Sequence, residues 1–268
     1  MEKIDLTDKF FHSPNWENKQ DLQRFRSIIK SGVLLTPKES GYSTRYFNDR
    51  IFFAAHPDSK MNPYYENDED NGFDMATRGT FFIFNSKLNE DYVLVPGAYQ
   101  YEYTTTSNVD LYKYLVGIGN AGLNIDGRLV YCYYYLKYIN GEISLDELIQ
   151  RIRERNLNKR LSEAVESTIY NIYCGILPEY DYLPYVLAHN PEDFIRTENY
   201  FEIEKILKEA KKDIVLCDKF GYCVNPQGRM QEIKEMKEYI DHTPLDEKTH
   251  FEKAKEICLA AENFSIRH

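Results

Sequence analysis

The sequence holds few side chains whose type and spacing could do chemistry, and His12 is the first of them. It follows Phe10 and Phe11 at the end of an apolar run, and His56 follows a second such run at 51–55. An imidazole at the end of a strand can hold a polar ligand or move a proton. Each histidine can equally be structural, and both interpretations stay open. Because no HExxH or HxH pair occurs, we expect no zinc site.

A second candidate is the run 117–122, which has the GxGxxG spacing of dinucleotide-binding turns. Glycines in such a turn let the backbone approach a pyrophosphate at a helix N-terminus. The preceding residues 111–115, however, have the pattern of a helix, and Asp126 follows too soon to contact a ribose. We therefore predict a glycine-rich connection between helices here, not a Rossmann site.

The acidic run 67–72 is similar in composition to a calcium-binding loop, in which oxygen ligands alternate around a glycine. With Gly72 at the sixth position, the twelfth position is Arg78, where an EF-hand needs a bidentate glutamate. The run therefore predicts a solvated acidic loop, and no metal is expected in the protein.

Composition limits the class of protein. The chain has 268 residues and a formal net charge of −10, which argues against a long series of phosphate contacts. Five cysteines without a CxxC pair indicate a reducing compartment. The first residues lack an apolar signal core, and no apolar run reaches 18 residues. These features predict a cytoplasmic protein with no membrane segment.

The predicted secondary structure differs between the two halves of the chain. The front half is predicted to form short strands, rich in β-branched and aromatic residues, at 9–12, 33–36, 50–55, 80–85, 92–95 and 99–104. A helix at 22–30 repeats apolar residues at helical spacing, and Gly32 is its natural cap.

Most of the remaining chain has helical spacing. Helices are predicted at 109–116, 128–139, 144–155, 160–173, 200–211, 230–240 and 248–263, with a small hairpin at 213–224. Ser144 and Glu147 form a capping box at the start of one of them. The prediction is an α+β fold: a domain at 1–106 with a mixed or antiparallel sheet, and a mostly helical region at 107–268 packed on it.

The order of features in the front half resembles the opening of the ADP-ribosyltransferases. In that family, a strand-ending histidine is followed by a helix, a glycine, a short strand, a Gly-Tyr loop and an aromatic strand. The matching residues are His12-Ser13, Ile28-Ile29, Gly32-Val33-Leu34, Gly41-Tyr42 and Ile51-Phe52-Phe53-Ala54. The resemblance extends weakly through 79–84 and 92–95 to Glu102.

The resemblance implies that NAD is a substrate. Its binding residues would be His12, Ser13, Tyr42, Arg45, Tyr46 and Phe53, with Arg50 as an alternative to Arg45. In this scheme His12 bonds to the ribose, a tyrosine stacks on the nicotinamide and an arginine neutralises the pyrophosphate. The resemblance implies that Glu102 and His12 are the catalytic residues, with Glu102 bonding to the ribose hydroxyl and stabilising positive charge on the ribose as nicotinamide leaves.

Two classes of function remain open at this stage. The first is a toxin-like bacterial or phage enzyme that transfers ADP-ribose to a protein or a nucleic acid and has a possible inhibitor protein. The second is a non-catalytic interaction module, because Tyr is favoured at interfaces and the chain holds 23 of them. Its surface would be the segment 176–185, with Tyr180 and Tyr182, although this segment could equally pack inside the protein.

Overall fold

The structure is a computed structural model that describes residues 2–14, 22–41, 49–57, 59, 72–97, 101–156, 161–176, 190, 191, 195, 198–243 and 246–265. The chain forms two compact units. One comprises residues 1–124 and 196–225, and the other comprises 125–195 and 226–268. This division differs from the expected boundary at 106, because residues 107–124 and the later segment 196–225 both belong to the first unit. The α+β prediction is confirmed, with the sheet in the first unit.

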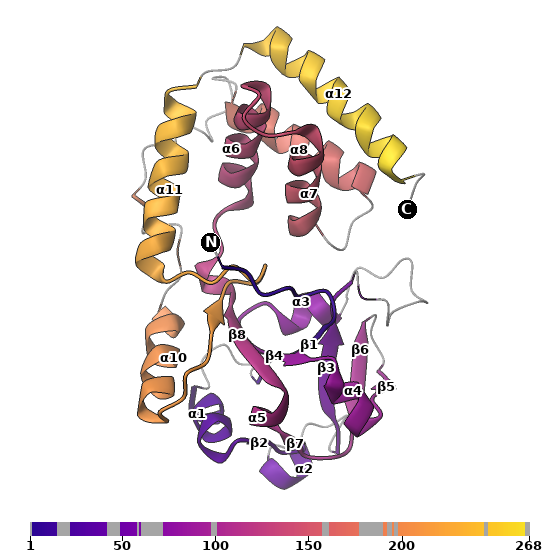
Figure 1. Cartoon of the computed structure of the whole chain (residues 1–268), viewed down its shortest axis with the longest axis vertical. Coiled ribbons are helices and arrows are strands. Elements are labelled where there is room, and N and C mark those ends of the chain that lie inside the picture. The colour runs from indigo at the N-terminus through magenta and orange to yellow at the C-terminus, as the bar shows by residue number, and fades with distance from the viewer. Residues whose placement is uncertain are drawn as a thin grey trace. The chain divides into compact units, whose positions relative to one another are not determined.

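A seven-stranded mixed sheet organises the first unit, in the order β5-β6-β3-β1-β4-β8-β9 (Figure 1). The strands are β1 (Lys9–His12), β3 (Ile51–Ala55), β4 (Thr80–Asn85), β5 (Val95–Pro96), β6 (Glu102–Thr105), β8 (Leu115–Asn120) and β9 (Leu216–Cys217). All neighbours pair antiparallel except β8 and β9, which are parallel. A second sheet joins β2 (Val33–Leu34) to β7 (Val109–Asp110).

Both faces of the central strands are buried. Successive side chains of a strand point to opposite faces, and on β4 the residues from Phe81 to Phe84 are all fully buried. Phe82 stacks on Phe25 of α1 (Leu22–Ser31), with ring centroids 5.3 Å apart. On the other face, Phe11 makes an edge contact with Phe73 of α3 (Gly72–Ala76). A continuous apolar sequence at 81–84 therefore marks a strand covered on both sides.

The remaining helices of the first unit are short, except the last. They are α2 (Pro37–Ser40), α4 (Lys87–Tyr92), α5 (Leu111–Tyr114), the 3₁₀ turn η1 (Ala121–Leu123) and α10 (Glu198–Glu209). Helix α1 buries Phe25, Ile28 and Ile29, as its spacing predicts. Gly32 ends it with a φ of 72°, and a Cβ there would lie 2.8 Å from the Tyr112 ring. The predicted glycine cap is confirmed.

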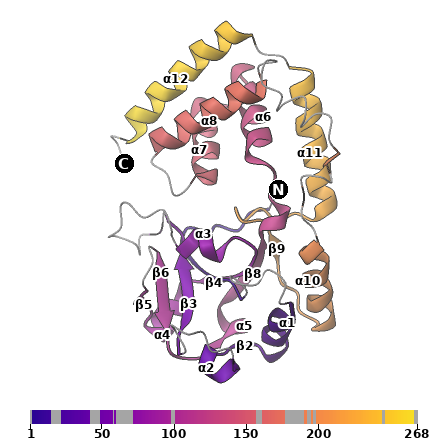
Figure 2. The same cartoon turned by 180° about the vertical axis from the view of Figure 1, so that it is seen from behind.

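The second unit is helical, as Figures 1 and 2 show. It comprises α6 (Gly127–Ile139), α7 (Leu145–Arg155), α8 (Leu161–Ile176), α11 (Pro226–Asp241) and α12 (Glu247–Ser265). The Ser144 side chain accepts a hydrogen bond from the Glu147 amide at 3.1 Å, which confirms it as the N-cap of α7. Tyr135 of α6 is fully buried and donates to the His250 carbonyl of α12 at 3.0 Å.

The prediction for the glycine-rich run 117–122 is wrong. Residues 115–120 form β8, not a connection between helices, and β8 pairs with β4. A Cβ at Gly119 would lie 2.0 Å from the Phe81 ring. The glycine thus makes room for a phenylalanine of the neighbouring strand. The helix predicted at 109–116 is only the single turn α5, capped by Asp110.

Two other strand predictions also fail in detail. Tyr92 ends helix α4, and Val93 follows with a φ of 47°, so the strand predicted at 92–95 shrinks to β5. In the predicted hairpin at 213–224, β9 pairs with β8 rather than with the residues after the turn. The turn is held by Asp218, whose carboxylate accepts bonds from the Phe220 and Tyr222 amides. Among the described residues, no helix has the length and apolarity to cross a membrane.

Candidate functional site at the end of strand β1

The central feature of the site is the His12 imidazole at the end of β1, between β3 and β4 in the sheet. Its Nδ1 lies 2.7 Å from the Phe52 carbonyl oxygen. A carbonyl can only accept, so Nδ1 carries the proton and donates it. In the neutral ring, Nε2 is then an acceptor. The neighbouring strand β3, which carries Phe52, thus fixes the tautomer of His12.

The His12 imidazole is neutral at pH 7. The pKa of His12 is lowered to about 4, chiefly by burial and to a smaller extent by the guanidinium of Arg24 on α1, while the hydrogen bond to Phe52 works in the opposite direction. The ring is therefore uncharged above about pH 5 and offers Nε2 as a hydrogen-bond acceptor.

Aromatic side chains hold the ring in place. The Phe82 ring lies almost parallel to it, at 3° and a centroid distance of 6.4 Å, and the Phe53 ring lies at 5.6 Å. Phe53 is 1% exposed and makes an edge contact with Phe84. Phe53 therefore supports His12 from the core. Its predicted contact with a cofactor stays a prediction.

Polar groups gather at the same end of the sheet, where β1 and β8 end and β4 begins. Ser13 Oγ donates to the Thr80 carbonyl at 3.4 Å. The buried Asn120 lies next to Thr80, with its Nδ2 3.5 Å from Thr80 Oγ1, and its Oδ1 accepts from the Gly122 amide at 2.7 Å. Thr80 and Asn120 were not expected at the site. Antiparallel pairing of the predicted strands could have indicated Thr80, but Asn120 needed the unrecognised strand β8.

Glu102 does not share the face of His12. In the antiparallel register, Phe11 pairs with Ala54, and Ala54 pairs with Glu102, so these three side chains share one face. His12 is the next residue after Phe11 and projects to the opposite face. The Glu102 carboxylate instead packs over Gly97, where a Cβ would lie 2.2 Å from Oε2. The structure thus does not bring together the two residues predicted to be catalytic.

The other predicted ligands of NAD divide between described and undescribed residues. Tyr42, Arg45 and Tyr46 lie outside the described residues. Arg50 precedes β3, and its Nη1 donates to Thr104 Oγ1 at 3.3 Å. Its side chain is 44% exposed, and its Nε lies 4.0 Å from the Asp49 carboxylate, so Arg50 retains access to solvent.

His56, the buried Cys132 and the partly buried Cys223 have the surroundings of structural residues. His56 is 7% exposed and makes an edge contact with Phe73 of α3, with centroids 5.2 Å apart. Burial raises the pKa of Cys132 to about 12 and raises that of Cys223 as well, so neither thiol has the character of a nucleophile.

In the described part of the chain, no group of three or more His, Cys, Asp or Glu side chains is arranged to hold a metal ion. Most of the acidic run 67–72 lies outside the described residues, and its Gly72 begins α3. Comparisons with protein-family models, curated proteins and solved structures give no match to the chain. The assignment of function therefore depends on the geometry around His12.

Proposed function

We propose that the protein is an NAD-dependent enzyme of the ADP-ribosyltransferase type, with the nicotinamide-side ribose of NAD bound at His12. The observation that carries the proposal is the fixed tautomer of His12, which presents an uncharged Nε2 acceptor at the end of a central strand. A ribose hydroxyl is a donor that matches this acceptor.

The uncharged state of His12 suits the reaction. Cleavage of the nicotinamide–ribose bond builds positive charge on the ribose, and an imidazolium ion beside it would oppose that charge. A neutral imidazole can orient the hydroxyl without that penalty. The Arg24 guanidinium, whose charge acts on His12, supplies a cation on the same side of the sheet for the pyrophosphate of the donor.

Glu102 has no role in the reaction as we propose it. Its carboxylate lies on the face opposite to His12, so it cannot bond to the ribose that His12 holds. The residue that stabilises the developing charge is left unassigned, and Tyr42, Arg45 and Tyr46 keep their proposed roles as donor ligands.

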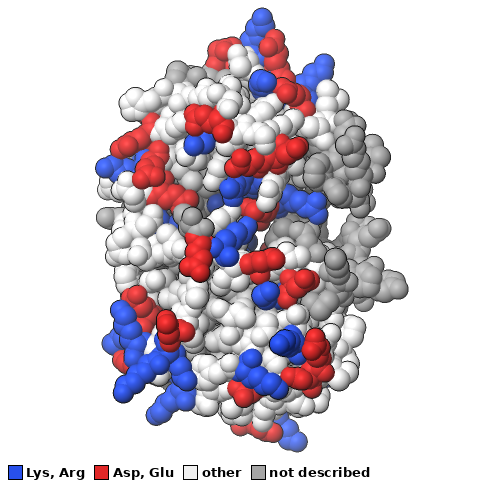
Figure 3. Space-filling model, viewed as in Figure 1, with Lys and Arg blue, Asp and Glu red and all other residues white. Residues whose placement is uncertain are grey.

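The acceptor of ADP-ribose stays open between a protein and a nucleic acid. On the face seen in Figure 3, Lys and Arg side chains gather over α1 and α10. Arg26 of α1 lies 4.0 Å from Glu209 of α10. Such partly neutralised charges are typical of a solvated face, and they do not choose between the two acceptor classes.

The test of this proposal is nicotinamide release from NAD by the purified protein, its His12→Asn variant and its Glu102→Gln variant. We expect release by the wild type, a loss of at least about tenfold in His12→Asn because the ribose loses one acceptor, and normal release in Glu102→Gln. Equal turnover in wild type and His12→Asn would contradict the proposal. Loss in Glu102→Gln alone would show that the register argument is wrong.

The alternative function, an interaction module, would use the segment 176–185. Of this segment only Ile176 belongs to the described residues, so Tyr180 and Tyr182 lie outside them. No observation in the described structure favours this alternative over the enzyme.

A further inference from the structure

Three polar side chains at the end of β1, β4 and β8 lie on one face of the sheet. His12 pairs with Phe82 of β4. Thr80 precedes Phe82 by two residues, so it projects to the same face, and it pairs with Asn120 of β8. His12, Thr80 and Asn120 therefore form a polar row on the face that α1 covers through the stack of Phe25 on Phe82.

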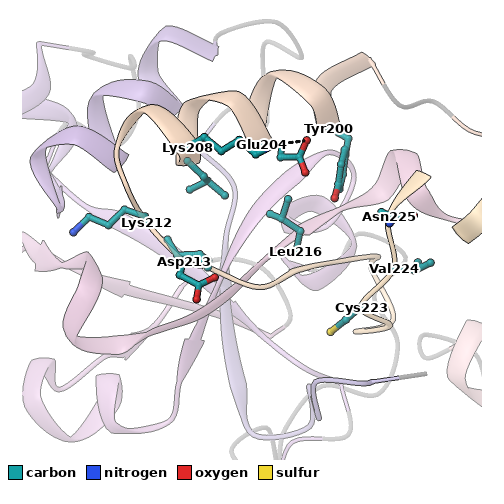
Figure 4. A pocket seen from close by; sticks show the side chains of 11 residues that line it. Tyr200, Glu204, Lys208, Lys212, Asp213, Leu216, Cys223, Val224 and Asn225 are labelled. Carbon is teal, nitrogen blue, oxygen red and sulfur yellow. Dashed lines mark ion pairs between the residues drawn. The ribbon is translucent and has the colours of Figure 1, made fainter. Parts of the chain in front are cut away.

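A neighbouring hollow under α10 is separate from the polar row. It is lined by one side of α10 and by residues 212–214, 216 and 223–225, and no member of the polar row is among them. Figure 4 shows Lys212 and Asp213 at one end of this hollow and Tyr200 and Asn225 at the other. Charges of both signs and polar groups border it, so its lining selects no class of ligand. The polar row has the more specific geometry.

Asn120 is the fixed member of the polar row. It is only 4% exposed, and its Oδ1 accepts a hydrogen bond from the Gly122 amide at 2.7 Å. That bond sets the orientation of the side-chain amide, so Nδ2 is the atom that faces Thr80 Oγ1, at 3.5 Å. An amide nitrogen can only donate, so the Thr80 proton points away from it. Because Thr80 is partly exposed, that proton can be donated to a ligand.

His12 and Thr80 are complementary in their hydrogen bonding. Nδ1 of His12 donates to the Phe52 carbonyl, which leaves Nε2 as an acceptor, whereas Thr80 is oriented as a donor. The two residues are diagonal neighbours across antiparallel strands, a position in which Cα atoms lie about 7–8 Å apart. A pair of adjacent hydroxyls, each at about 2.8 Å from its partner, can bridge such groups, since a hydroxyl both donates and accepts.

We propose that Thr80 acts together with His12 to bind the two hydroxyls of the nicotinamide-side ribose, and that Asn120 is the positioning residue that orients Thr80. One hydroxyl donates to His12 Nε2, and its neighbour accepts from Thr80 Oγ1. This inference rests on the proposed function and narrows its substrate to a dinucleotide whose nicotinamide-side ribose carries both hydroxyls. A substrate that lacks either hydroxyl loses one of the two bonds.

The test is isothermal titration, under conditions of negligible turnover, with NAD and with its analogues that lack the 2′- or the 3′-hydroxyl of that ribose. In the wild type each analogue should bind about fivefold more weakly than NAD, because one hydrogen bond is lost. Thr80→Val should weaken NAD by a similar factor, and Thr80→Ser should restore the wild-type affinity. The matched control is Thr77→Val, at a buried threonine after α3, on the opposite face of the sheet, and it should leave the affinity for NAD unchanged.

The analogues identify the partner of each residue. Thr80→Val should leave one analogue at its wild-type affinity, because that analogue lacks the hydroxyl that Thr80 contacts. His12→Asn should spare the other analogue. Asn120→Ser keeps an oxygen for the Gly122 amide but loses the contact with Thr80. It should therefore weaken NAD binding in the wild type and have no further effect in Thr80→Val.

The inference would be overturned by an unchanged affinity for NAD in Thr80→Val, by an equal loss for NAD and both analogues in that variant, or by no recovery in Thr80→Ser. If His12→Asn weakens NAD binding and Thr80→Val does not, the proposed function stands and this inference alone fails. Absence of NAD binding to the wild type would contradict both.

Discussion

The two faces of the seven-stranded sheet carry the two residues that the sequence places in one active site. On one face His12 lies among Phe53 and Phe82, beneath helix α1. On the other face Glu102 shares the side of Phe11 and Ala54. Both residues sit on neighbouring parts of the same sheet, yet alternation along each strand separates them. The comparison shows that a correct set of strands does not define a site until the register is known.

The largest effect that tests this comparison comes from one phenylalanine on each face. Phe82→Ala and Phe81→Ala each remove a fully buried ring and should lower the free energy of unfolding by about 3–5 kcal/mol, measured by urea denaturation. Only Phe82→Ala should also raise the pKa of His12, because it lets water reach that face. An equal rise in Phe81→Ala would break the comparison. If Phe82→Ala fails to fold, Phe82→Leu should give the same shift in a smaller amount.

A second, somewhat smaller effect concerns pH. Folding lowers the pKa of His12 from its ordinary value of 6.5 to about 4, so between these values the unfolded chain binds a proton that the folded protein does not. This contribution to stability is fully present above pH 6.5 and is lost as the pH falls toward 4, at a cost of up to about 3 kcal/mol. His12→Asn should remove that part of the pH dependence. Urea denaturation of the wild type and of His12→Asn at pH 7.5 and pH 4.5 measures this contribution. An equal loss of unfolding free energy in both proteins between these pH values would show that His12 is not buried as described.

The smallest effect tests the face of the sheet that carries Glu102. In Gly97→Ala the new Cβ would clash with Oε2, Cδ and also Cγ of Glu102, so the whole Glu102 side chain must change rotamer, and the loss of stability should be about 1–2 kcal/mol. Because Glu102 lies away from His12, nicotinamide release should stay at the wild-type rate. A strong loss of turnover in a stable Gly97→Ala protein would return Glu102 to the active site.

Local sequence patterns predicted much of the fold. The spacing of Phe25, Ile28 and Ile29 with Gly32 after them defined α1, because helix periodicity and a left-handed cap are local properties. The Ser144 cap of α7 was found for the same reason. The apolar run in β4 was also sufficient to identify a strand.

Features that depend on distant residues were not predictable in this way. Strand β8 was missed because its glycines have the pattern of a loop. In the structure, Gly119 makes room for Phe81 of β4, and Gly117 makes room for the side chain of Ile4. Asn120 was missed with it. The face of Glu102 depends on pairing with β3, and no local pattern reports a register.

His12 was predicted as a site residue from its position at a strand end together with the resemblance to the ADP-ribosyltransferases, and the structure adds its surroundings. Its tautomer comes from the carbonyl of Phe52, forty residues further along the chain. Its neutrality comes chiefly from burial, which the packing of the sheet and α1 creates.

The most direct measurement is the nitrogen NMR spectrum of ¹⁵N-histidine-labelled protein, recorded at pH 7 with increasing NAD. The account predicts a neutral His12 ring with the proton on Nδ1, and a saturable upfield movement of its Nε2 resonance as that nitrogen accepts a hydrogen bond from NAD. A proton on Nε2 in the free protein, or an Nε2 resonance that ignores millimolar NAD, would contradict the central claim.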